Sequence, residues 1–350
     1  MKMQKYTLGF ALLMVFAVSL TLIATAQNKN SGSPKNTPAQ ASAYKLSGPY
    51  VHNNLTVFLV HGKDMIKGKD ILTLQEAMER KIVIVHETKE VNELAIENTS
   101  KTLDVFVQSG DIVKGGQQDR MLAVDLIVPP RSGKIPIAAF CVESGRWSKR
   151  GNEESTQFTG SSDRIATRDL KIAANSSKSQ SEVWEKVGEA QDKLSQNVGG
   201  SVNSSKSGSS LQLSLENIKV KETTDGYIKQ LSQIVEGQTD VIGYAFAING
   251  HVNSADVYAS SALFKKLWPK LLKATAIEAV ADLTRDLKFE PVSRAQVDAF
   301  FAKTEKGKAS EKNVNSRTKM VTRETDDGLF LESRDMKADS MWVHRSYVLK

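Results

Sequence analysis

The stretch Met121–Glu143, MLAVDLIVPPRSGKIPIAAFCVE, decides the fold class. Apolar side chains alternate along Leu122–Val128 with the two-residue period of a half-buried strand, and this run stops at Pro129-Pro130. The polar turn Arg131–Lys134 follows, and Ile135–Val142 is apolar again. Two apolar runs joined by a short polar turn predict antiparallel strands, so we expect a β meander that forms one layer of a sandwich.

The β pattern continues on the N-terminal side of this stretch. Alternating or continuous apolar runs predict further strands at residues 55–60, 82–86, 94–96 and 103–107. The segment Ile71–Glu79 fits either a strand or a short helix. The first half of the chain is therefore expected to be mainly β.

The middle of the chain changes to helical spacing. Ser148–Asp163 is polar and is predicted to be a loop. Ser179 followed by Glu182 matches a capping box at the start of an amphipathic helix, which Gly199-Gly200 ends. A mobile segment rich in Ser and Gly follows, and another amphipathic helix is predicted from Thr224.

The last hundred residues combine a hairpin with further helices and strands. Asn249-Gly250 between two apolar runs predicts a two-residue hairpin. A helix capped by Ser260 or Ser261 should follow, and Pro269 predicts a kink in it or a junction between two helices. The remaining elements expected are a helix from residue 293 and strands at 320–322, 329–331 and 341–348. We therefore predict an α+β fold, an antiparallel β meander or sandwich with helices from the second half packed on it, in a single domain of residues 44–350.

Residues 1–26 have the features of an export signal. Lys2 and Lys5 precede the apolar stretch Leu8–Ile23, and Ala24-Thr25-Ala26 supplies the small residues that a signal peptidase recognises. A membrane anchor is the alternative, but the stretch is short for a bilayer span of about 20 apolar residues. We expect a cleaved signal peptide, a flexible tether over residues 27–43, and a periplasmic or secreted protein with no stable membrane insertion.

The charge balance and the cysteine content exclude several classes of protein. Loss of residues 1–26, which hold two lysines and no acid, lowers the formal charge from +7 to +5. No basic stripe with interleaved aromatic residues occurs, so we expect no nucleic-acid partner, and the mild excess favours anions. The only cysteine, Cys141, cannot form an internal disulfide and is predicted to be buried. The five histidines show no metal-ligand spacing, so neither a metal nor a cofactor is expected.

The candidate site comprises GDIVKGGQQDR, Gly110–Arg120, and CVESGRW, Cys141–Trp147, where glycines, amides and both signs of charge gather at strand ends. Glycines let backbone N–H groups approach a ligand, basic groups meet phosphate or carboxylate, and tryptophan stacks on rings. The candidate ligand-binding residues are Gly110, Asp111, Lys114, Gly115, Gly116, Gln117, Gln118, Arg120, Arg146 and Trp147. Asp119 and Glu143 are the candidate catalytic acid and base.

The same residues also fit a purely structural role. Asp119 or Glu143 paired with Arg120 or Arg146 would clamp two strand ends together, and the glycines would serve tight turns and bulges. A ligand site requires these groups to meet at an open concavity, whereas a clamp requires them to be sealed against one another.

Three segments resemble a known family: GDIVKGGQQDR, IPIAAFCVESGRW, and GYAFAING followed by LFKKLWPKLL. They are similar to the family named for its association with ADP-ribosylglycohydrolases and rhodanese-phosphatase proteins, over roughly Asn53–Asp282. The family has no established activity. Its name implies only that its genes occur together with genes of ADP-ribose and phosphate metabolism.

Two functions of different class follow as hypotheses. The first is an exported binding or scaffold module for an anionic polar small molecule or a partner. The second is a hydrolase of a phosphate- or ADP-ribose-like substrate, with Asp119 or Glu143 as acid or base and Arg120 as an electrostatic clamp.

Overall fold

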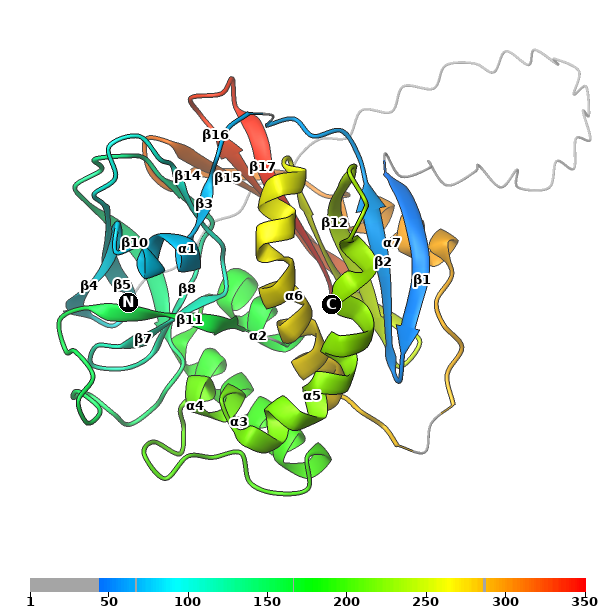
Figure 1. The fold of residues 1–350 in the computed structure, drawn as a ribbon, viewed down its shortest axis with the longest axis horizontal. Coiled ribbons are helices and arrows are strands. Elements are labelled where there is room, and N and C mark those ends of the chain that lie inside the picture. The colour runs from blue at the N-terminus through cyan, green and yellow to red at the C-terminus, as the bar shows by residue number, and fades with distance from the viewer. Residues whose placement is uncertain (1–43, 67, 166, 286–287) are drawn as a thin grey trace, which may run out of the picture. The chain divides into compact units, whose positions relative to one another are not determined.

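The computed structural model describes residues 44–350 except 67, 166 and 286–287 (Figure 1). The expected signal peptide and tether lie outside the described residues. The part of the chain that is described forms three sheets and seven α-helices, most of them in the second half. The predicted α+β class is therefore confirmed.

The largest sheet has eight strands and is antiparallel throughout. Its strands, in spatial order, are β1 (Lys45–His52), β2 (Leu55–His61), β12 (Val241–Ile248), β13 (His251–Tyr258), β17 (Met341–Leu349), β16 (Gly328–Asp335), β15 (Thr318–Thr325) and β14 (Ser310–Asn313). Helix α6 (Ser261–Ala281) packs against β12, and α7 (Arg294–Thr304) packs against β16 and β17.

Alternate side chains of the central strands pack into two separate hydrophobic clusters. Leu55, Val57 and Leu59 belong to the cluster that contains the apolar residues of α6, whereas Phe58 and Val60 pack with those of α7. Since both faces are covered, every residue of β2 and of β12 is buried. This explains why these strands read as continuous apolar runs.

The two smaller sheets come from the chain between β2 and α2. The six-stranded sheet has the order β11 (Phe158–Arg164), β7 (Asp111–Gly115), β8 (Arg120–Leu122), β10 (Lys134–Cys141), β5 (Glu93–Asn98) and β4 (Val83–Glu90). The three-stranded sheet has the order β3 (Leu72–Thr73), β6 (Val105–Val107) and β9 (Leu126–Val128). A further hydrophobic cluster joins these two sheets.

The remaining helices are α1 (Leu74–Glu79), α2 (Arg168–Ile172), α3 (Gln180–Asn197), α4 (Leu211–Leu215) and α5 (Ile218–Leu231), with a π turn at Ala173–Ser177 and a 3₁₀ turn at Ser232–Val235. Figure 1 shows α5 and α6 side by side, in agreement with their packing contacts. No helix within the described ranges is long and apolar enough to cross a membrane.

Three sequence predictions about strands need correction. The apolar run Leu122–Val128 is not one strand, because Asp125 interrupts it and β8 and β9 enter different sheets. Ser148–Asp163 is not a loop throughout, since its end pairs with β7 as β11. The ambiguous Ile71–Glu79 contains both alternatives, β3 followed by α1 with Thr73 as its cap.

Two helix predictions also need correction. Helix α5 starts at Ile218, six residues before Thr224, because Asn217 caps it. Of the two alternatives predicted at Pro269, the structure excludes the junction, because helix α6 continues through this residue. Sixteen residues of α6 are buried, so packing outweighs the cost of about 3 kcal/mol that an interior proline carries.

Candidate functional site

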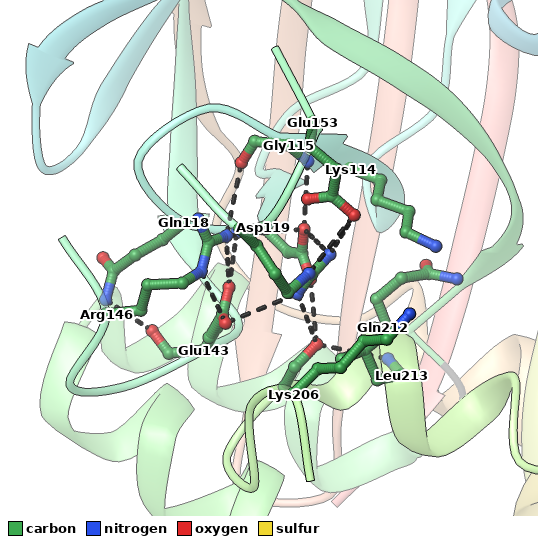
Figure 2. A network of polar contacts seen from close by, with 12 residues as sticks. Lys114, Gly115, Gln118, Asp119, Glu143, Arg146, Glu153, Lys206, Gln212 and Leu213 are labelled. Atoms are coloured by element: carbon green, nitrogen blue, oxygen red, sulfur yellow. Dashed lines mark hydrogen bonds and ion pairs between the residues drawn. The ribbon is translucent and has the colours of Figure 1, made fainter. Parts of the chain in front are cut away.

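Asp119 and Glu143 lie at the centre of a closed polar network (Figure 2), and both side chains are fully buried. Arg150 donates to both carboxylate oxygens of Asp119, at 2.8 and 3.0 Å. The backbone N–H of Gly115 and the hydroxyl of Ser210 donate to the same carboxylate, at 3.0 and 2.8 Å. Asp119 therefore has four hydrogen bonds from three groups.

Glu143 is paired in the same way with Arg146. The Arg146 guanidinium donates to its two oxygens at 2.7 and 2.6 Å, and the backbone N–H of Asp119 donates at 3.0 Å. Burial alone would raise the pKa of Glu143, but these hydrogen bonds outweigh burial and lower it. Glu143 is thus held in its ionised form.

The backbone of the predicted glycine-rich loop closes the network. Gly115 and Gly116 have φ values of 117° and 57°, a region that favours glycine, and a Cβ on Gly116 would lie 2.3 Å from the Phe158 ring. The side-chain amide of Gln118 donates to the carbonyl of Glu143 at 2.7 Å. The glycines therefore serve tight packing of the loop.

Other predicted site residues have partners elsewhere. Lys114 pairs with Glu216 at 2.9 Å, and the backbone N–H of Gln117 donates to Glu87 at 3.0 Å. Asp111 pairs with Lys270 of α6 at 2.8 Å. Gly110, with φ 95°, packs against the side chain of Ile165.

Arg120 is fully buried but does not pair with Asp119 or Glu143. Its guanidinium donates to the Val91 carbonyl and to the sulfur of Cys141, the latter at 2.9 Å, and lies 3.7 Å from Glu87. Adjacent residues of an extended chain point to opposite sides, so Arg120 and Asp119 take different partners. Cys141 is buried and free, as its sequence predicts.

The outer part of the candidate site is a short surface loop between two anchors. Arg146 and Arg150 are buried or nearly so, whereas Trp147, Ser148 and Lys149 between them are exposed. The Arg120 guanidinium lies 5.5 Å from the centroid of the Trp147 ring, and 48% of Trp147 remains exposed. The loop therefore presents an aromatic and a basic side chain to solvent.

Sequence reasoning missed several members of the network, among them Arg150, its partner Glu153, and Ser210. Arg150 follows Arg146 by four residues, and this second arginine beside two predicted carboxylates was an available signal. Ser210 caps α4 and lies 91 positions from Asp119, so no local pattern links the two.

A second charged cluster, which the sequence did not indicate, surrounds His344 of β17. Its ring nitrogens lie 2.7 Å from Asp125 and 3.2 Å from Asp256, and its ring stacks on Tyr258 at 4.6 Å between centroids. Burial disfavours the charged imidazole, but Asp125 and Asp256 outweigh it and raise the pKa of His344 to about 9. Arg164 lies 3.7 Å from Asp256. Within the described ranges, no group of three or more His, Cys, Asp or Glu side chains has the arrangement of a metal site.

Residues 43–348 match the family model of the ARG and Rhodanese-Phosphatase-superfamily-associated Protein domain, ARPP-1. This range is wider than the segment Asn53–Asp282 that carries the sequence resemblance. No curated protein and no solved structure matches the chain. Because the family model covers most of its length, the chain belongs to the ARPP-1 domain family.

Proposed function

We propose that this chain is an exported binding module, and that the loop around Trp147 takes an anionic polar molecule that carries a ring. The observation that carries the proposal is the fixed geometry of this loop. Arg146 and Arg150 anchor its two ends through buried ion pairs, and Ser209 bonds to the backbone of Ser144 at its start. A loop that is ordered before binding loses less conformational entropy when it binds.

The exposed groups of the loop define the ligand class. The indole of Trp147 offers a surface for ring stacking, and Lys149 adds a positive charge. Arg120 lies close to the indole and helps to fix it. These groups suit a nucleotide-like molecule, in which a ring and a phosphate occur together.

The hydrolase hypothesis has weaker support. A general acid or base must reach its substrate and needs a pKa near the working pH. Asp119 and Glu143 are fully buried and paired with arginines, and the pKa of Glu143 is lowered. This geometry favours the structural role of the two carboxylates.

ADP-ribose and AMP are suitable probes for the test, with isothermal titration calorimetry as the measurement. We expect the parent chain to bind at least one of them, Trp147→Ala to lose that binding, and Trp184→Ala to retain it. Trp184 is the matched control because it is also partly exposed but lies on α3. Equal binding by the parent and Trp147→Ala, or no binding at all, would refute the proposal. Consumption of ADP-ribose by the parent would instead revive the hydrolase hypothesis.

Export has its own test. Intact-mass measurement of the secreted chain should give a first residue of Gln27, because Ala24 and Ala26 precede the expected cut. Retention of Met1–Ala26 would contradict export by a cleaved signal.

A further inference from the structure

A polar cavity of about 220 Å³ lies on the face of the eight-stranded sheet that carries α7, over β15, β16 and β17. These strands are labelled at the top of Figure 1. Three arginines line it, Arg323, Arg334 and Arg345, together with Glu305 and Glu332. The cavity shares no residue with the network around Asp119 or with the loop around Trp147.

Strand register explains why these side chains meet. Glu332 lies opposite Arg345 of β17 on one side and opposite Val321 of β15 on the other. Positions two apart on one strand share a face, so Arg323 joins Val321, and Arg334 joins Glu332. Val321 and Phe330 are buried beneath these charges and form the apolar part of the lining.

The charges of the cavity do not cancel. Glu332, which is nearly fully buried, accepts hydrogen bonds from Arg334 at 2.5 Å and from Arg345 at 2.6 Å. Glu305 accepts from the Tyr347 hydroxyl at 2.7 Å. Arg323 donates to the Gly307 carbonyl at 2.8 Å, and it forms no ion pair with any residue that the structure describes. Three guanidinium groups therefore face two carboxylates, and Arg323 is the cation without an acidic partner.

Arg345 is held in position before any ligand arrives. Its guanidinium carbon lies 4.5 Å from the centroid of the Trp342 ring, and it donates to the Tyr44 hydroxyl at 3.0 Å. Fixed guanidinium groups recognise carboxylate and phosphate through paired N–H donors at low entropic cost.

We propose that this cavity binds a small oxyanion of the phosphate or carboxylate class, with Arg323 as the main ligand-binding cation and Arg345 as a preset second donor. The volume is below the roughly 300 Å³ at which pockets for drug-sized molecules begin, so the ligand is a small anion or the anionic end of a larger molecule.

The test uses the full chain and two probes, inorganic phosphate and acetate, titrated against chloride at constant ionic strength. Thermal unfolding should show that at least one probe raises the Tm of the parent. Arg323→Gln should lose most of this rise, and Arg323→Lys should retain part of it because the charge stays and the planar fork is lost. Arg131→Gln is the matched control. Arg131 is exposed and lies in the turn between β9 and β10, so this variant should respond like the parent.

Glu332→Gln should strengthen the binding of phosphate, whereas Arg323→Gln should weaken it. Glu332→Gln removes the carboxylate that competes with the ligand for Arg334 and Arg345, so phosphate should bind severalfold more tightly by calorimetry. Comparison of the phosphate and acetate titrations shows whether the cavity prefers a phosphate or a carboxylate ligand. An equal response of the parent and Arg323→Gln, or no response to either probe, overturns the proposal. These titrations do not test the loop around Trp147. The cavity proposal and the proposed function can therefore be refuted independently.

Discussion

Arg150 links the two buried carboxylates of the candidate site, because its guanidinium reaches Asp119 at 2.8 Å and Glu143 at 3.4 Å. Its pKa is raised by Asp119 in spite of burial, so it stays charged. Removal of this group leaves two buried negative charges with one cation fewer. We expect Arg150→Met to lower the free energy of unfolding by about 3–5 kcal/mol.

Urea unfolding followed by circular dichroism measures this effect. Lys149→Met is the matched control, because it removes the neighbouring exposed cation and should change stability by no more than about 0.5 kcal/mol. A loss below about 1 kcal/mol in Arg150→Met would contradict the structural role of the network.

At the scale of single residues, the sequence predicted which charged residues lie together better than it predicted which of them pair. It identified Asp119, Glu143 and Arg146 as one group, and the structure brings them together. It also offered Arg120 as a partner, but neighbouring side chains on an extended backbone diverge, and Arg120 bonds to Val91 and Cys141 instead. Ser210 could not be found, since its contact with Asp119 depends on how the connection between α3 and α4 folds back.

At the scale of elements, close packing of β12 against β13 depends on Gly243. A Cβ at this position would lie 2.4 Å from the Asp256 carbonyl oxygen and 2.8 Å from the Val257 Cα, both backbone atoms that cannot move aside alone. Gly243→Ala should therefore lower the free energy of unfolding by about 1–3 kcal/mol.

Urea unfolding measures this effect, and Gly188 is the control glycine, at which alanine should stabilise the protein. It lies inside α3, and apart from the neighbouring backbone of this helix no atom lies within 4 Å of a Cβ built there. Alanine has the higher helix propensity, so Gly188→Ala should raise stability by about 0.5–1 kcal/mol. If Gly243→Ala and Gly188→Ala changed the free energy of unfolding equally, the close contact of Gly243 with β13 would not contribute to stability.

Elements with strong local signals were predictable, and elements set by distant contacts were not. Asn249 and Gly250 have φ values of 51° and 77°, as the predicted hairpin turn requires. Ser293 caps α7 as expected, with Gln296 completing a capping box. By contrast, the division of Leu122–Val128 between two sheets follows from Asp125, whose carboxylate bonds to Ser109 and His344.

At the scale of the whole molecule, His344 connects the eight-stranded sheet to the segment between β8 and β9. The charged and titratable groups around its ring are Asp125, Asp256, Arg164 and Tyr258, and Gln108 also approaches it. Its pKa rises from 6.5 to about 9 on folding. The folded state thus binds the proton more tightly, so the stabilisation is complete below pH 6.5 and is lost as the pH rises toward 9.

Deprotonation of His344 is expected to lower the free energy of unfolding by about 3 kcal/mol between pH 6.5 and about 9. Urea unfolding at several pH values measures this loss. His344→Gln should remove this dependence relative to the parent, whereas His251→Gln, at an exposed position, should keep it. Parallel pH profiles for the parent and His344→Gln would contradict a protonated His344.

The position of β17 has a consequence for synthesis of the protein. It follows every other strand of its sheet in the sequence, yet it lies between β13 and β16 and pairs with both. On a chain that emerges from the ribosome, the strands from β1 to β13 and those from β14 to β16 lack the strand that pairs with both groups until residues 341–349 have been made. The same order makes early termination costly, since a ribosome that stops before residue 341 omits the strand that pairs with both parts of the sheet.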